Sequence, residues 1–77
     1  MNPLKLEYRS VEALIPYARN AKQHPDAQVA QIAASIREFG WGAPILVDGN
    51  NNVIAGHGRL LAARKLGMAE VPVVSMD

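Results

Sequence analysis

The sequence contains no cysteine, which excludes disulfide bonds, thiolate metal ligands and a cysteine nucleophile. It also contains no apolar run near the roughly 20 residues that a helix needs to cross a bilayer. Its first residues do not follow the pattern of a signal peptide. From these absences we expect a soluble, cytoplasmic protein with no membrane partner.

Aromatic residues and net charge are also scarce. The 77 residues include one Trp, two Tyr and one Phe, although 49% are hydrophobic, so we expect one small domain over residues 1–77 with an aliphatic core. The net charge of +1 is too small to predict nucleic-acid binding by itself. The distribution of charge is uneven, because no acidic residue lies between Glu12 and Asp26.

The most informative stretch joins a short strand to a helix through a glycine-rich turn. Val53–Ala55 is apolar and predicts the end of a strand, and Gly56–Gly58 predicts a turn because glycine tolerates positive φ. From Arg59 onward, Leu, Ala, Arg and Lys favour a helix, which Gly67 ends as a C-cap. Such an arrangement leaves N–H groups unpaired at the helix start, where the helix dipole also favours an anion.

Arg59 strengthens the expectation of an anion site. On a helix it shares one face with Ala62, Ala63 and Leu66, which are apolar. A cation beside the positive end of the dipole needs a counter-charge, either a carboxylate of the fold or a ligand phosphate, and the sequence leaves both open. His57 is the candidate catalytic residue, because a histidine can donate to the same anion or act as an acid or base near neutral pH.

A second candidate segment is Ile15–Pro25. Two prolines and the lack of periodicity predict a loop, and loops of this length in a small domain are often functional. The side chains in it that suit a phosphate or a base are Arg19, Asn20, Lys22 and His24. A solvated connection is the alternative, and the sequence does not choose between them.

The remaining pattern predicts a small α/β domain of mixed α+β type, with the order β, α, β, β, α, β. Leu4–Tyr8, Ile45–Val47 and Val71–Val74 are predicted strands, and Asp48–Asn52 predicts a hairpin turn. Pro72 favours either an edge position for the last strand or a place among the first residues of that strand.

A helix is predicted from Asp26 to Phe39, with Gly40 ending it. Its apolar stripe, which we expect in the core, is Val29, Ile32, Ala33, Ile36 and Phe39. Trp41 follows between two glycines and suits either packing or stacking on a base.

Together these segments resemble the N-terminal domain of the ParB family, which shares its fold with sulfiredoxin. The similar segments, in chain order, are Ile15-Pro16, Gln31–Gly40, Pro44–Val47, Ile54–Ala63 and Val71–Val74. The chain looks most like ParB-like domains of phage proteins and of proteins beside DNA methyltransferases. The resemblance implies a ParB/sulfiredoxin-like fold of about four strands and two main helices, as the N-terminal part of a longer protein.

The resemblance also implies a nucleotide site. The family's Gly-Glu-Arg-Arg turn holds the phosphates of CTP, and the Gly-Cys-His-Arg turn of sulfiredoxin holds those of ATP. Gly56, His57, Gly58 and Arg59 occupy these positions, with Gly56 and Arg59 retained and the two middle residues changed. Arg19 to His24 match the family's Asn-Pro-rich loop, which implies that they close over the ligand. Sulfiredoxin chemistry is excluded because the chain has no cysteine.

We therefore expect a nucleotide- or phosphate-binding module of a DNA-associated protein, taking CTP or ATP with or without Mg²⁺. DNA would be reached through neighbouring domains or an oligomer such as a homodimer. One alternative is a metal-assisted nuclease or weak nucleotide hydrolase that uses His57. The scattered carboxylates do not by themselves support this, and we expect no metal site built by the protein alone. The other alternative is a protein-interaction domain in which Arg59 pairs with an acid.

Overall fold

The computed structural model describes residues 5–17 and 24–76. Its elements in chain order are β1 (Leu6–Ser10), the 3-10 helix η1 (Val11–Ala13), α2 (Asp26–Phe39), β2 (Ile45–Val47), β3 (Val53–Ala55), α3 (His57–Lys65) and β4 (Glu70–Ser75). This order confirms the predicted α+β class and the alternation of strands and helices.

The strands form one mixed sheet in the order β1-β4-β2-β3. β1 pairs antiparallel with β4, β4 lies parallel to β2, and β2 pairs antiparallel with β3. The predicted hairpin between β2 and β3 is confirmed. Asp48 stabilises its turn by accepting the backbone N–H groups of Asn50 and Asn52 at 2.8 and 2.9 Å.

The predicted bounds of the first strand and the edge position considered for Pro72 were wrong, whereas the alternative for Pro72, a place among the first residues of its strand, is confirmed. β1 continues to Ser10, beyond the predicted end at Tyr8, because the ladder with β4 runs as far as the Ser10–Glu70 pair. β4 is a central strand although it contains Pro72. The ladder between β4 and β2 begins only at Val73, so Pro72 lies where β4 pairs with β1 alone and its missing N–H removes no bond to β2.

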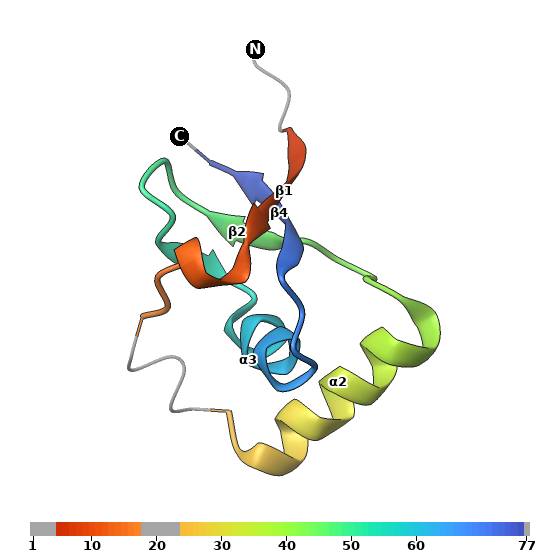
Figure 1. Cartoon of the computed structure of the whole chain (residues 1–77). Helices are drawn as coiled ribbons and strands as arrows, with labels where there is room; N and C mark the ends of the chain where they lie inside the picture. Colours follow the sequence, from red (N-terminus) through yellow and green to blue (C-terminus); the bar gives the residue numbers. More distant parts are fainter. Residues whose placement is uncertain (1–4, 18–23, 77) are drawn as a thin grey trace.

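The helices form two further layers on the sheet, and α3 lies between the sheet and α2 (Figure 1). Leu60 and Ala63 of α3 belong to the buried cluster that also contains Ile45, Val71 and Val73 of the sheet. Ala62 instead joins a second cluster with Val29 and Ala33 of α2. Because α3 is covered on both sides, its buried residues are small or aliphatic, with the exception of His57 at its start.

Helix α2 has the predicted bounds, but its last apolar residue does not reach the core. Val29 and Ala33 are buried and Ile32 and Ile36 are partly buried, as expected. Phe39 was predicted in the core and is 78% exposed. It occupies the last helical position, beyond the part of α2 that α3 covers.

Helix α3 begins at His57, earlier than the predicted start at Arg59, and Gly56 is its N-cap. Gly67 follows the C-cap Leu66 with a φ of 71°, so glycine ends the helix as predicted. In the described part of the chain, no helix is long and apolar enough to cross a membrane.

Candidate functional site at the start of helix α3

Gly56 connects β3 to α3 in a conformation that favours glycine. Its φ and ψ are 98° and 25°, in the left-handed region. A Cβ atom here would lie 3.3 Å from both Cα and Cγ1 of Ile45, so the turn lies directly against β2. Beyond this turn the first N–H groups of α3 have no partner within the helix, as at every helix N-terminus. The predicted strand–turn–helix segment is therefore present.

Arg59 turns its guanidinium back toward this turn. Its Nη1 lies 3.4 Å from the position that a Cβ atom on Gly56 would take. Among the described residues the ion pair present is Arg9 with Glu7, at 2.8 Å, and Arg59 pairs with none of their carboxylates. The carboxylate counter-charge that the sequence left open is thus not found in residues 5–17 and 24–76.

A groove adjoins the Arg59 side chain. It has a volume of about 420 Å³ and is lined by the C-terminal half of α2, by residues 40–43 and by Arg59. Trp41 forms part of its wall and also packs against the core, so the structure supports the packing role predicted for it. No sequence pattern indicates that α2 and Arg59 share a groove, because their proximity depends on how the two helices pack.

His57 lies at the first position of α3 and is 5% exposed. Its Nε2 accepts the backbone N–H of Tyr17 at 3.3 Å. Burial lowers the pKa of the imidazole below its ordinary value, and the charge of nearby His24 lowers it further. Near neutral pH the ring is therefore uncharged, with its hydrogen on Nδ1. The catalytic role predicted for His57 stays a prediction.

His24 is brought to the same turn from the segment before α2. Its Nδ1 lies 3.2 Å from the position that a Cβ atom on Gly58 would take, and 2.9 Å from Oε1 of Gln28. Gly58 also lies against Ile32 of α2, so its lack of a side chain permits close helix packing. The other three loop candidates, Arg19, Asn20 and Lys22, lie outside the described residues.

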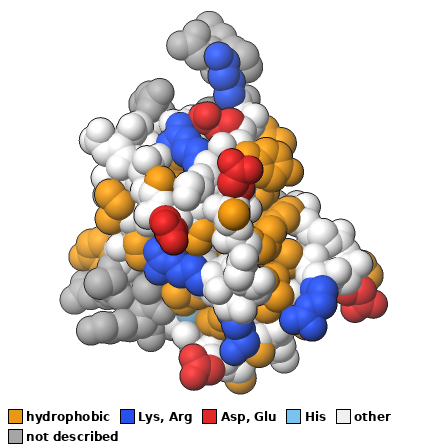
Figure 2. Space-filling view, in the orientation of Figure 1, with side chains coloured by type: hydrophobic (Ala, Val, Ile, Leu, Met, Phe, Trp, Pro, Cys, Tyr) orange, Lys and Arg blue, Asp and Glu red, His pale blue; other side chains and the backbone are white. Residues whose placement is uncertain are grey.

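The structure shows two other features that bear on function. The described residues contain no group of three or more His, Asp or Glu side chains placed to hold a metal ion. On the face shown in Figure 2, Lys and Arg side chains are interspersed with Asp and Glu and form no continuous basic surface. This agrees with the small net charge.

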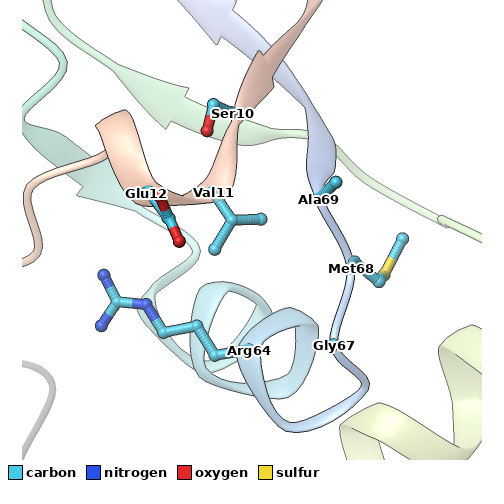
Figure 3. Close-up of a pocket in the computed structure, with 7 residues that line it drawn as sticks. All are labelled: Ser10, Val11, Glu12, Arg64, Gly67, Met68 and Ala69. Atoms are coloured by element: carbon cyan, nitrogen blue, oxygen red, sulfur yellow. The ribbon is translucent and has the colours of Figure 1, made fainter.

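A larger hollow of about 760 Å³ lies at the other end of α3. η1 contributes Glu12 to its lining and α3 contributes Arg64, whose side chains lie on the same side of the hollow (Figure 3). Since these opposite charges compensate each other, the hollow lacks the excess positive charge that a phosphate would favour. The turn at Gly56 is the better candidate for an anion.

Comparison with known proteins decides the family. A family model described as the ParB N-terminal domain matches residues 5–77. The chain belongs to the ParB N-terminal domain family. This domain is also 51% identical over 74 residues to the ParB-like nuclease domain-containing protein YnaK of Escherichia coli K12, a match that covers 96% of this chain and 85% of YnaK.

Solved structures agree with this assignment. The ParB N-terminal domain is similar to a pNOB8-like ParB-N domain, with a TM-score of 0.79 and 28% identity over 97% of this chain and 30% of that chain. A second similar structure is the C-terminally truncated chromosome-partitioning protein ParB of Caulobacter crescentus, complexed with CTP-γ-S. The TM-score is 0.77 and the sequence identity is 25%, over 95% of this chain and 44% of that chain. The present chain therefore spans less than half the length of each of these two solved ParB chains.

Sulfiredoxin from Arabidopsis thaliana shares the fold. The TM-score is 0.84 at 21% identity, and the match covers 95% of this chain and 85% of sulfiredoxin. The resemblance to the ParB N-terminal domain and the fold shared with sulfiredoxin, both inferred from the sequence, are thus confirmed.

Proposed function

We propose that this ParB N-terminal domain binds the phosphates of a nucleoside triphosphate, CTP or ATP, at the Gly56–Arg59 turn. The observation that carries the proposal is Arg59. Its guanidinium lies at the N-terminus of a helix, beside a glycine turn, and has no carboxylate partner among the described residues. A phosphate would supply the missing counter-charge and accept hydrogen bonds from the first N–H groups of α3, which have no partner within the helix.

The structure of Caulobacter crescentus ParB with CTP-γ-S supports this choice of ligand, since that protein is 25% identical over 95% of the chain. The nucleoside would extend from the phosphates into the groove beside Arg59, with the ring of Trp41 as one wall. Any Mg²⁺ would be held mainly by phosphate oxygens, as is common for this ion. DNA would be engaged by neighbouring domains or an oligomer, as expected for a module of a DNA-associated protein.

The test is a calorimetric titration with CTP, ATP and GTP, each with and without Mg²⁺. Arg59→Ala should weaken binding at least about tenfold, because charge-assisted bonds to phosphate contribute roughly 1.5–3 kcal/mol. Arg64→Ala is the matched control, since Arg64 is an exposed arginine at the opposite end of the same helix and should leave affinity unchanged. Trp41, the one tryptophan of the chain, gives an independent fluorescence signal from the groove.

Two results would overturn the proposal. One is the absence of binding to every nucleotide at millimolar concentration. The other is saturable binding that Arg59→Ala does not affect, which would place the ligand elsewhere and favour a domain that only contacts other proteins.

Nuclease activity is a second candidate, favoured by the name of the 51% identical relative YnaK, which contains a ParB-like nuclease domain. Incubation with supercoiled plasmid and Mg²⁺ tests it. Nicking that is lost in His57→Gln and absent in EDTA would support a metal-assisted nuclease that uses His57. Nicking that persists unchanged in His57→Gln would point to a contaminating nuclease or to other residues.

A further inference from the structure

Two separate parts of the chain lie against the first turn of α3. Tyr17 donates its backbone N–H to Nε2 of His57, and the ring of His24 lies beside Gly58. The chain before Tyr17 is fixed as well. Ile15 donates its N–H to the carbonyl of Asn51 and accepts the N–H of Val53, both at 2.9 Å. Within residues 5–17 and 24–76, the hydrogen bond that follows Ile15 and holds Tyr17 at the turn is therefore the one to His57.

This bond depends on the protonation state of His57. Nε2 can accept an N–H only when the ring is neutral and its hydrogen is on Nδ1. In the imidazolium form both ring nitrogens carry hydrogen, so the N–H of Tyr17 would face another N–H and the bond would be lost. Because His57 is buried, its side chain cannot turn to water without moving its neighbours.

The surroundings of His57 oppose its protonation. His24 from the preceding segment and Arg59 from α3 are the basic groups at this turn, and the helix dipole adds positive potential there. Ile32 of α2 and Ile45 of β2, which lie against Gly58 and Gly56, are apolar, and Gln28 of α2, which contacts the His24 ring, is uncharged. No described carboxylate contributes to the lowered pKa of His57.

We propose that His57 is a positioning residue, and that its contact with Tyr17 is a proton-sensitive latch at the start of α3. Neutral His57 holds residue 17 against the turn, and protonation releases it. The latch is a property of the free protein. If phosphates bind at this turn, pH also decides whether Tyr17 stays beside them. This consequence rests on the proposed function.

The sign of the pH dependence follows from the direction of the shift. Since the folded protein holds His57 at a pKa below the ordinary value of 6.5, the unfolded chain binds more protons between these two values. The stabilisation from neutral His57 is therefore complete above pH 6.5 and is lost as the pH falls through the lowered pKa. The latch opens in this acidic range.

The experiment is an NMR titration of the free wild-type protein from about pH 8 to about pH 5, the range in which histidines titrate. It follows the ring of His57 and the hydrogen-exchange protection factor of the Tyr17 amide. Protection should fall by about tenfold as the ring becomes protonated, as expected for loss of one hydrogen bond. The ring nitrogen shifts should show hydrogen on Nδ1 at the upper end of the range.

Two variants separate a latch from a merely structural histidine. In His57→Gln the side-chain carbonyl can still accept the Tyr17 N–H but cannot titrate, so protection should persist without pH dependence. His24→Gln removes the nearby charge, so the pH at which Tyr17 is released should rise toward 6.5. This second variant keeps the test decisive if His57→Gln fails to fold.

The latch is overturned if Tyr17 protection does not change while the His57 ring titrates. It is equally overturned if His57→Gln retains the wild-type pH dependence, or if His24→Gln leaves the release pH unchanged. Because no nucleotide is present, these outcomes are independent of whether the phosphate proposal holds.

Discussion

Gly58 of α3 and Ile32 of α2 lie so close that a Cβ atom on Gly58 would come within 2.9 Å of Cδ1 of Ile32. Alanine at this position would also press on the His24 ring, at 3.2 Å. We expect this overpacking in Gly58→Ala to lower the free energy of unfolding by about 1–3 kcal/mol. The better helix propensity of alanine should offset up to about 1 kcal/mol of that loss. Urea unfolding followed by circular dichroism measures this change.

The contact between the helices can be isolated with a second substitution. Ile32→Val removes the methyl group that Cβ of alanine at position 58 would meet. Gly58→Ala should therefore lower the free energy of unfolding by less in the Ile32→Val protein than in the wild type. Gly42→Ala is the matched control, since a Cβ atom on Gly42 would meet nothing within 4 Å. Equal costs of Gly58→Ala in both backgrounds would show that the Ile32 contact does not determine the effect.

Gly56→Ala should be destabilising for a different reason. At a φ of 98°, a residue with a side chain is strained by about 1–3 kcal/mol, and its Cβ would meet the backbone of Ile45 at 3.3 Å. Backbone cannot move aside as the end of a side chain can. A drop in the midpoint of thermal unfolding, compared with Gly42→Ala, is the measurement. A fully stable Gly56→Ala protein would contradict the turn geometry.

Two large apolar residues of the helices should respond very differently to truncation. Leu60 is fully buried in the cluster between α3 and the sheet, so Leu60→Ala should lower the free energy of unfolding by about 2–5 kcal/mol. Phe39 is 78% exposed, and Phe39→Ala should change the free energy of unfolding by no more than about 0.5 kcal/mol. A large loss in Phe39→Ala would show that its ring packs against something outside the described residues.

The β2–β3 turn should make folding sensitive to acid. The carboxylate of Asp48 accepts hydrogen bonds from the side chain of Asn52 and from the backbone N–H groups of Asn52 and Asn50. These bonds lower the pKa of Asp48 below its ordinary value of 3.8. The folded state therefore favours the carboxylate, and its stabilising effect is present above pH 3.8 and lost as the pH falls through the lowered pKa. Asp48→Asn should flatten the thermal stability curve in this acidic range. An unchanged acid slope would mean that other groups control it.

Much of the fold was predictable because it depends on local signals. Asp26–Phe39 combines a helical apolar period with a terminal glycine, and Asp48–Asn52 has the composition of a hairpin turn. The glycine turn before α3 was predictable for the same reason, since a positive φ at Gly56 is a property of one residue. Together with the order of segments, these signals were enough to indicate the family.

The candidate site was only partly predictable. The sequence indicated that Arg59 needed an anion, because the helix dipole acts within a single turn. It did not indicate that the N–H of Tyr17 meets His57, since every residue except proline has this group and residue type cannot single it out. The groove beside Arg59 also escaped prediction, because its walls come from α2 and from residues 40–43.

The sequence by itself determined the order of the strands and helices, the glycine turn and the need of Arg59 for a counter-charge, because each depends on neighbours a few residues away. Only the tertiary structure decided that Pro72 lies in a central strand, that Phe39 is exposed and that His57 is buried as an acceptor. It also gave Gly58 its packing role against Ile32. These outcomes depend on which surfaces the sheet and helices cover, and that is fixed by contacts between distant parts of the chain.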